Sequence, residues 1–415
     1  MAPAVEERTA LDLETAVTAV TAGALRPGPG GSVGLELEAH LVDLDAPACR
    51  VPWDRVTAAV AALPPLPGGS RVTLEPGGQV ELSGPPLPGA AAAVAALRAD
   101  RAVLATALAA ARLGLAPVGA DPLRRPARVS PGPRYRAMER HFTAVGCGSA
   151  GTAMMTATAS LQVNLDAGPR DGWSGRVALA HQLGPVLVAV SACSPLLGGR
   201  ATGWRSSRQR VWGALDQARC GPLLGGDDPA GEWAHYALAA PVMLVRDADT
   251  GAAEPVLTRT RFADWVTGAV PLGGRRPTAA DLDYHLSTLF PPVRLRGYLE
   301  IRYLDAAPEP WWPALAAVTT ALLDDAGAAD AAAEASAPVA GAWDRAARDG
   351  LADRDLRTAA VRCLSAALAV VDPSLRPEVE ALAALAEAGR CPGDALPRDP
   401  AAALLTATET PEVHP

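Results

Sequence analysis

The chain has 415 residues and a formal net charge of −8 at pH 7, and it contains no lysine. This length allows one large domain or two ordinary ones. The acidic balance, with no basic run, argues against partners such as nucleic acid or anionic lipid. The lack of lysine excludes a P-loop, a kinase-type strand lysine and a Schiff base to pyridoxal phosphate, so any nucleotide chemistry must use arginine and metal.

The ends and the apolar runs of the chain indicate a soluble, cytoplasmic protein. Residues 1–14 are acidic and lack the apolar region of a signal peptide, and Arg and Asp interrupt the Ala-rich runs before they reach membrane-spanning length. The six cysteines are scattered without a C-x-x-C motif, which predicts reduced thiols and no structural zinc.

The first part of the chain mixes helical and strand patterns. The expected elements are a helix at 9–25, a strand at 33–43, a helix at 52–63, two strands about a Pro-Gly-Gly turn within 71–86, a helix at 90–113, a helix from 133, a Gly-rich loop at 146–151 and a strand that ends at 166.

The second part becomes increasingly helical. The expected elements are a helix at 173–194 with a kink at Pro185, a helix at 203–218, a strand at 240–246, a helix at 280–290, one strand at 293–304 and helices over 311–389. The order predicts an α+β fold with a single catalytic domain over 1–395. Its strand-rich core covers about 30–310 and a helical layer about 311–390, and 396–415 is expected to be a mobile tail.

Four predicted strands carry polar side chains on one face and aliphatic side chains on the other. A half-exposed antiparallel sheet gives the same alternation, so that explanation stays open for any single strand. The residues of the polar faces are Glu36, Glu38 and His40; Gln79, Glu81 and Ser83; Ser160, Gln162, Asn164 and Asp166; and Arg294, Arg296, Tyr298, Glu300 and Arg302.

The types of residue on these faces suggest a catalytic sheet. Glutamates along one face repel each other unless a cation lies between them. Brought together, they would form an all-oxygen site suited to Mg²⁺ or Mn²⁺, with the arginines supplying the opposite charge. Phosphoryl transfer from Mg·ATP requires this combination. The expected metal ligands are Glu36, Glu38, Glu81 and Glu300.

Six segments, in order, resemble the plant-type glutamate-cysteine ligases, and together they span about Gly34 to Trp312. The resemblance implies a glutamine-synthetase-like fold, with a curved, mainly antiparallel sheet whose polar catalytic face is packed by helices. It also implies ATP-dependent joining of the glutamate γ-carboxylate to the amine of cysteine through γ-glutamyl phosphate. The GC-rich composition is similar to that of the actinobacterial enzymes that make γ-glutamylcysteine for ergothioneine. The segments are GLELEAHLVD, TLEPGGQVELSGPPL, RYRAMERHF, GTAMMTATASLQVNLDAG, SSRQRVWGALDQARCG and VRLRGYLEIRYLDAAPEPWW.

The same resemblance implies roles for individual residues. The strand glutamates listed above would hold metal, with Glu300 also catalytic. Arg302 would hold the transferring phosphoryl group. The remaining residues would contact substrate or ATP, with Gln162 or Asn164 also possible as a neutral metal ligand; they are Arg208, Arg219, Arg296, Gln162 and Asn164.

Several alternatives stay open at this point. The protein could be a related ligase that joins glutamate to a different amine, or a non-catalytic family member. A solvated helix explains any single arginine of the segment 204–221, including Arg208 and Arg219. His40 and His141 receive no role because a lone histidine is more often packed or solvated. Glu75 could hold its turn, support the site indirectly or bind metal or substrate directly.

Overall fold

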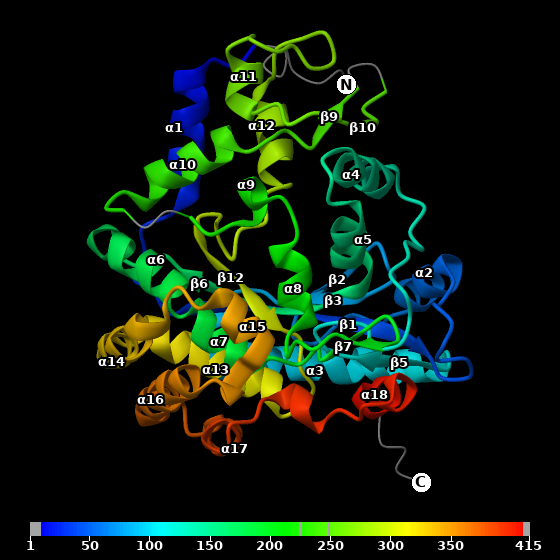
Figure 1. Ribbon diagram of the computed structural model, residues 1–415, viewed down its shortest axis with the longest axis vertical. Helices are drawn as coiled ribbons and strands as arrows, with labels where there is room; N and C mark the ends of the chain where they lie inside the picture. Colours follow the sequence, from blue (N-terminus) through cyan, green and yellow to red (C-terminus); the bar gives the residue numbers. More distant parts are fainter. Residues whose placement is uncertain (1–9, 224–225, 248–249, 410–415) are drawn as a thin grey trace.

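The computed structural model describes residues 10–223, 226–247 and 250–409, and its central feature is an eight-stranded sheet (Figure 1). Six strands follow the order β11-β12-β6-β1-β3-β2, while β4 and β5 also pair with β1, and all these pairs are antiparallel. The strands are β1 (Ser32–Asp43), β2 (Arg71–Leu74), β3 (Val80–Ser83), β4 (Leu87–Pro88), β5 (Leu113–Ala116), β6 (Ser160–Asp166), β11 (Val293–Leu295) and β12 (Tyr298–Asp305). The predicted α+β class with a mainly antiparallel sheet is confirmed.

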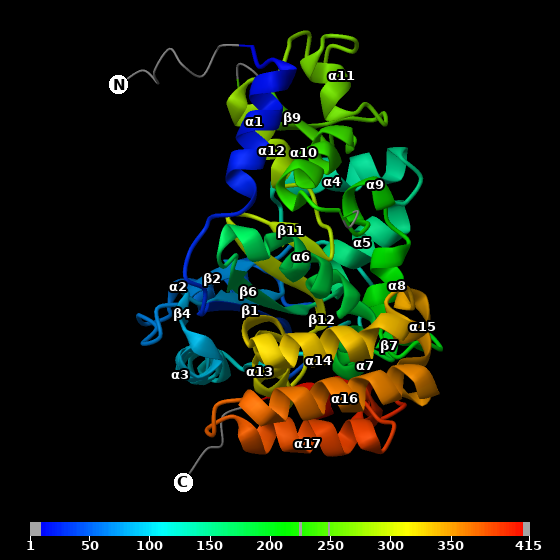
Figure 2. The ribbon, with the colours of Figure 1, turned by 90° about the vertical axis from the view of Figure 1, so that its left-hand side faces the viewer.

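The aliphatic face of the sheet is covered by helices that lie below it in Figures 1 and 2. Leu35, Val163 and Ile301 on this face are at most 1% exposed, so burial of the alternate aliphatic side chains fixes which face turns inward. The covering helices are α3 (Gly89–Ala110), α7 (Gly184–Ser191) and α13 (Trp311–Asp324), followed outward by α14 (Ala326–Ser336), α15 (Trp343–Asp349), α16 (Arg354–Val370), α17 (Arg376–Glu387) and α18 (Pro400–Ala407).

The polar face of the sheet is turned toward a second set of helices, above it in Figure 1. Of these, α4 (Pro133–Ala144), α5 (Gly148–Ala157) and α8 (Ser207–Gly213) contribute side chains to the space over the polar face. The remaining elements are α1 (Leu13–Ala24), α2 (Trp53–Ala61), α6 (Trp173–Gln182), α9 (Gln217–Cys220), α10 (Pro229–Ala239), α11 (Phe262–Val266), α12 (Ala279–Leu286) and the small ribbons β7–β8 (Leu196–Leu197, Arg200–Ala201) and β9–β10 (Leu244–Arg246, Ala253–Pro255).

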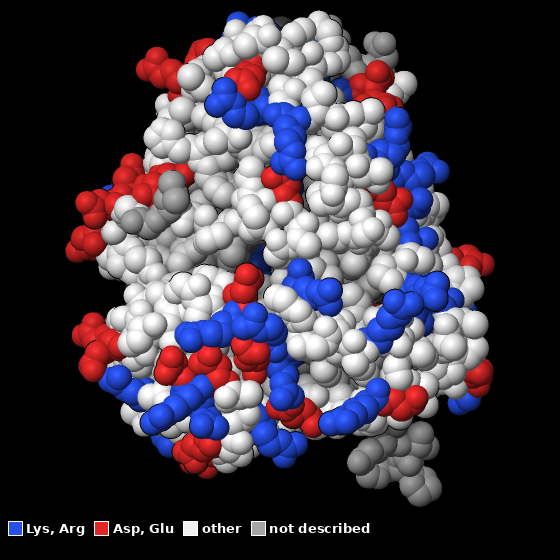
Figure 3. Space-filling model, viewed as in Figure 1, with Lys and Arg blue, Asp and Glu red and all other residues white. Residues whose placement is uncertain are grey.

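No helix in the described ranges is both long and apolar enough to cross a bilayer. Basic and acidic side chains lie side by side over the lower part of this face (Figure 3).

The single strand predicted at 293–304 is wrong, because this segment is a β-hairpin. Strands β11 and β12 meet at a turn through Arg296 and Gly297, and Gly297 has a φ of +84°. A glycine within an alternating run permits the positive φ that a tight turn needs. Arg294 pairs directly with Glu300, and because residues opposite each other share a face, the predicted polar face survives the turn.

Two helical predictions and one loop prediction also need correction. The segment 203–218 forms two helices, since Asp216 accepts a hydrogen bond from the Ala218 N–H and starts α9 separately from α8. The segment 173–194 likewise divides, with Pro185 in the first turn of α7. The Gly-rich stretch 146–151 is largely the beginning of α5 and not a loop.

The end of the chain differs from the expected tail. Residues 400–407 form α18, whose Leu404 is fully buried, and the Glu409 N–H donates to the Leu115 carbonyl at 2.7 Å. Asp399 caps this helix, a start signal that an Asp-Pro pair before an Ala/Leu run can give. Residues 410–415 lie outside the described residues, and one catalytic domain over 1–395 remains a prediction.

Candidate active site

The register of the sheet brings the predicted polar residues of four strands onto one face. Glu38 pairs with Glu81, and Asn164 pairs with Glu300. These side chains border a cavity of about 480 Å³. Its lining includes eight predicted site residues, namely Glu36, Glu38, Glu81, Gln162, Arg208, Arg296, Glu300 and Arg302, together with Arg71, Thr73, Glu75, Arg134, Tyr135 and Arg294.

One side of the cavity is built from carboxylates. Glu81 accepts hydrogen bonds from Thr73 Oγ1 at 2.9 Å and from Ser83 Oγ at 3.1 Å. Glu36 accepts one from Asn164 Nδ2 at 3.1 Å, so the predicted residue Asn164 reaches the site through Glu36. Burial, with the charges of nearby carboxylates including Glu81, raises the pKa of Glu36 to about 7.

Two further carboxylates complete this side. Glu38 accepts a hydrogen bond from the Ser160 N–H at 2.7 Å, and burial raises its pKa. Glu75, which sequence analysis left without a fixed role, lines the same cavity. Burial, followed by the charges of Glu38 and Glu81, holds its pKa well above the usual range. The carboxylates therefore repel one another, and protons or cations relieve that repulsion.

The donor set of these four glutamates fits a hard divalent cation. Their oxygens are the ligands that Mg²⁺ prefers. The pKa values of Glu36, Glu38 and Glu75 are raised, as expected for buried carboxylates. Within the described ranges, no three His, Cys, Asp or Glu side chains already form a cage for a metal. Mg²⁺ commonly uses one or two carboxylates together with water and substrate phosphates, so a complete protein cage is not needed.

The opposite side of the cavity is built from arginines arranged around Glu300. Arg294 contacts both carboxylate oxygens of this residue, through Nε and Nη2, the latter at 2.9 Å. Arg302 lies at 3.3 Å and Arg296 at 3.8 Å from it. Burial opposes ionisation, yet Arg294 and Arg302 lower the pKa of Glu300 to about 2. Arg294 thus contacts both oxygens of Glu300, and the metal role of Glu300 stays a prediction.

Replacement of Glu300 by Gln is expected to destabilise the protein, because it leaves the buried Arg294 without its partner. A loss of about 3–5 kcal/mol in the free energy of unfolding is typical of a broken buried pair. Chemical denaturation would measure it. Glu309→Gln is the matched control, since its pair with Arg98 is partly exposed and should contribute less than about 1 kcal/mol. Equal stability of both variants would contradict a stabilising role of the clamp, by which we mean the contact of Arg294 with both oxygens of Glu300.

Two arginines that line the cavity have a donor without a hydrogen-bond partner among the described residues. Arg302 donates from Nη1 to Gln162 Oε1 at 2.6 Å, and Arg208 donates from Nη2 to the Arg302 carbonyl at 2.6 Å. Within the described residues, Arg302 Nε and Arg208 Nη1 are buried and have no hydrogen-bond partner. Such donors suit the oxygens of a phosphoryl or carboxylate group.

Arg219 does not join the site. Its side chain is fully buried, and the guanidinium donates to the Thr288 carbonyl at 2.7 Å and to the Pro241 carbonyl. It is absent from the lining of the cavity. The break between α8 and α9 changes the helical phase, so Arg219 cannot share a face with Arg208 as one continuous helix would allow.

The family follows from comparison with known proteins. Residues 32–403 match the model described as glutamate-cysteine ligase family 2 (GCS2). The chain belongs to this glutamate-cysteine ligase family. It is 60% identical over 383 residues to the glutamate-cysteine ligase EgtA of Mycolicibacterium smegmatis, covering 92% of this chain and 90% of the relative. The EgtA of Mycobacterium tuberculosis H37Rv is 55% identical over 385 residues, with 92% and 89% covered.

More distant members of the glutamate-cysteine ligases also match. The chloroplastic glutamate-cysteine ligase of Medicago truncatula is 31% identical over 275 residues, covering 64% of this chain and 52% of the relative. The crystal structure of the Francisella tularensis glutamate-cysteine ligase GshA with AMP has the same fold, with a TM-score of 0.54 at 14% identity and coverage of 89% and 84%. The family suggested by the sequence motifs is thus confirmed.

Several lining residues of this glutamate-cysteine ligase family member were missed or left open by sequence reasoning. Arg71, Thr73 and Glu75 share the parity of Glu81, and Thr73 pairs with Glu81 in the sheet. Extending the strand pattern through the Pro-Gly-Gly turn could have found them. Arg134 comes from α4, outside the sheet, and no periodicity predicts its approach.

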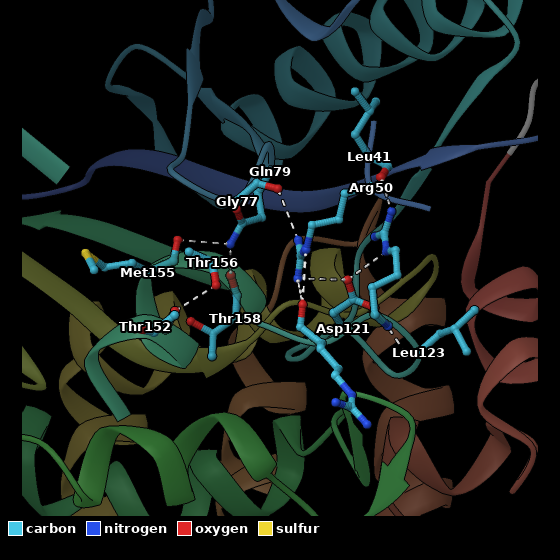
Figure 4. Close-up of polar contacts among 12 residues, drawn as sticks. Leu41, Arg50, Gly77, Gln79, Asp121, Leu123, Thr152, Met155, Thr156 and Thr158 are labelled. Carbon is cyan, nitrogen blue, oxygen red and sulfur yellow. Dashed lines mark hydrogen bonds and ion pairs between the residues drawn. The ribbon is translucent and has the colours of Figure 1, made fainter. Parts of the chain in front are cut away.

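The turn that carries Glu75 is fixed from behind by a buried polar network (Figure 4). Arg50 donates to the Gly77 carbonyl at 3.2 Å and lies 3.8 Å from Asp121. Gln79 donates to the Thr158 carbonyl at 2.9 Å. Gln79, expected on the polar face, lines the cavity but is buried, and its amide nitrogen supports the turn.

Gly77→Ala is expected to destabilise this turn. A Cβ at Gly77 would lie 2.2 Å from the Thr156 carbonyl oxygen, which is backbone and cannot swing away. Overpacking of this kind costs about 1–3 kcal/mol, and thermal denaturation would measure it. Gly175→Ala in α6 is the control, since nothing lies within 4 Å of its Cβ position and the change should be neutral or stabilising. A Gly77→Ala variant as stable as the control would contradict the tight contact.

Cation binding is expected to strengthen with pH around neutrality. The folded-state pKa of Glu36, about 7, exceeds its ordinary value of 4.5. Without a cation, the stability from its protonation is therefore full below about pH 4.5 and is lost as the pH rises through about 7. Because Mg²⁺ requires the ionised form, its apparent affinity should rise about tenfold from pH 6 to 8. Calorimetric titration with Mg²⁺ alone measures this, and a flat profile would contradict it. The Glu36→Gln variant should have a weaker pH dependence.

Proposed function

We propose that this protein joins the γ-carboxylate of L-glutamate to the amine of L-cysteine, using ATP and producing γ-glutamylcysteine, ADP and phosphate. The observation that carries the proposal is the two-sided cavity. It is lined by four glutamates of the sheet and its β2–β3 turn and by two arginines, Arg302 of β12 and Arg208 of α8, that each have a donor without a partner among the described residues. The 60% identity to a glutamate-cysteine ligase supports the choice of substrates.

The carboxylate side of the cavity suits Mg²⁺, with Mn²⁺ as an alternative. Glu36, Glu38, Glu75 and Glu81 would hold it, and the ion would neutralise phosphate charge during transfer. The bound metal ion and ATP are both part of the proposal.

The arginine side suits the phosphoryl group itself. In the first step the glutamate γ-carboxylate oxygen bonds to the γ-phosphorus of ATP and ADP leaves. In the second step the cysteine nitrogen bonds to the acyl carbon, phosphate leaves and the nitrogen loses a proton. The free Nε–H of Arg302 and Nη1–H of Arg208 would donate to oxygens that carry negative charge in these steps.

The pathway is a further part of the proposal. The similarity to the two mycobacterial EgtA proteins and the GC-rich composition support a role in making γ-glutamylcysteine for ergothioneine. A cytoplasmic location would match this biosynthetic role.

The test is phosphate release from ATP and Mg²⁺ with glutamate, with and without cysteine, and mass detection of the product. Cysteine-dependent turnover that yields γ-glutamylcysteine is the expected result. Turnover with only another amine, from a panel tested alongside, would keep the mechanism and overturn the acceptor. No turnover under any condition would favour a non-catalytic family member.

A further inference from the structure

Strand β12 is interrupted beside the active site by a change of register. Its pairing with β6 shifts between Ile301 and Leu304, as at a β-bulge. The carbonyls of Arg302 and Tyr303 within this irregularity accept hydrogen bonds from two side chains of α8, Arg208 Nη2 at 2.6 Å and Gln209 Nε2 at 2.7 Å. Irregularities of this kind next to active sites re-aim side chains, and here this one attaches α8 to the sheet.

Asp305 follows the bulge, and its carboxylate accepts several hydrogen bonds. It is 1% exposed. Its Oδ2 accepts from the Cys193 N–H at 3.0 Å and from Ser194 Oγ at 2.7 Å, while Oδ1 accepts from Ser206 Oγ at 2.9 Å. A buried carboxylate with this many donors is held in one orientation.

Arg208 is tied to that carboxylate by two routes. Its Nη1 lies 4.0 Å from Asp305 Oδ1, and its backbone N–H donates to the same Ser194 hydroxyl that donates to Asp305. Although Arg208 is only 3% exposed, it lines the cavity, and its Nη1 lacks a hydrogen-bond partner among the described residues. A buried cation with a free donor is expensive to hold unless a fixed carboxylate stands nearby.

We propose that Asp305 is a positioning residue for the ligation, holding Arg208 so that its free Nη1–H meets an anionic oxygen of the substrate. This inference rests on the proposed function. Asp305 contacts no substrate and acts only through Arg208.

The alternative partner of Arg208 explains why positioning matters. Glu38, on the carboxylate side of the cavity, also attracts the guanidinium, though less than Asp305 does. Without Asp305, Arg208 would turn toward Glu38. That movement would remove the donor from the substrate and would also take a carboxylate from the cation, so a single substitution would weaken both sides of the site.

A double-mutant cycle tests the proposal with Asp305→Asn, Arg208→Gln and the combined variant. We expect Asp305→Asn to lower kcat/KM by about tenfold or more in the wild-type background, yet by less than about threefold beside Arg208→Gln. The KM of the same substrate should rise in both single variants. If the losses in kcat/KM from the two substitutions multiply in the combined variant, the inference is overturned. A merely structural role of Asp305 would lower kcat/KM to the same extent with or without Arg208.

Two further variants keep the test decisive. Ser191→Ala is the matched control, because the Ser191 hydroxyl accepts from the Asp305 backbone N–H at 3.4 Å and does not touch the carboxylate. It should retain wild-type kinetics. If Asp305→Asn does not fold, Ser194→Ala replaces it in the cycle, since it removes only the hydroxyl that bridges Asp305 and Arg208. Unchanged kinetics in Ser194→Ala would then overturn the inference.

Wild-type turnover separates the two proposals. If the wild type makes γ-glutamylcysteine and the cycle is additive, only the role of Asp305 fails. If the wild type shows no turnover, the proposed function fails. The cycle is also run on calorimetric dissociation constants for glutamate and for Mg·ATP, where additive changes overturn the role of Asp305 and coupled changes support it.

Discussion

Glu36→Gln is expected to abolish ligase turnover, with kcat/KM at least about 1,000-fold lower, because one of the charged oxygens for the cation is lost. The fold should persist, since Glu36 is half-buried on the polar face and its replacement opens no core cavity. Removing one of several repelling carboxylates should leave the cation-free protein as stable as the wild type or more stable. Phosphate release and thermal denaturation without divalent cations would measure the two effects.

A control substitution separates this effect from a general loss of charge. Glu254→Gln makes the same change at an exposed position on β10, outside the lining of the cavity. It should retain wild-type kcat and KM. Full activity in the Glu36→Gln variant would show that the cation is held elsewhere.

Arg302→Lys is expected to lower kcat by about 100-fold or more, because a planar fork of donors is replaced by a single ammonium. Arg302 contacts both Gln162 and Glu300 while its Nε remains free, and a lysine cannot reproduce the three positions together. Steady-state kinetics at saturating ATP, glutamate and cysteine would measure the change.

The matched control for this prediction lies on α8. Arg210→Lys alters an exposed arginine two residues from Arg208. The guanidinium of Arg210 lies over the Trp204 ring. We expect its kcat to stay within about twofold of the wild type, as for most surface substitutions. A similar loss in both variants would indicate a nonspecific effect of replacing arginine.

The polar face of the sheet could be predicted because strand periodicity is simple. The prediction that Glu36, Glu38 and Glu81 share a face required only two rules. Alternate residues of a strand lie on one face, and the aliphatic neighbours turn toward the core. The hairpin through Gly297 did not disturb this prediction, because a direct pair such as Arg294 and Glu300 keeps its face across the turn.

Other features depended on contacts that periodicity does not encode. By strict alternation Asp305 belongs with Ile301 on the aliphatic face, but the register shift pairs it with Ser160, on the polar face. Arg219 was assigned to the site by the family resemblance, but its guanidinium donates to the Thr288 and Pro241 carbonyls away from the cavity. The pairing of Arg294 with Glu300 was missed because sequence reasoning gave the two charges different ligands. It assigned the glutamate to a metal ion and the arginines to anions.

The clamp around Glu300 has a consequence for how the site performs its chemistry. Arg294 and Arg302 are already oriented by a buried carboxylate before any ligand arrives. Donors that are fixed in this way need little reorganisation when charge develops on a reacting phosphoryl group. The electrostatic preorganisation is thus established during folding.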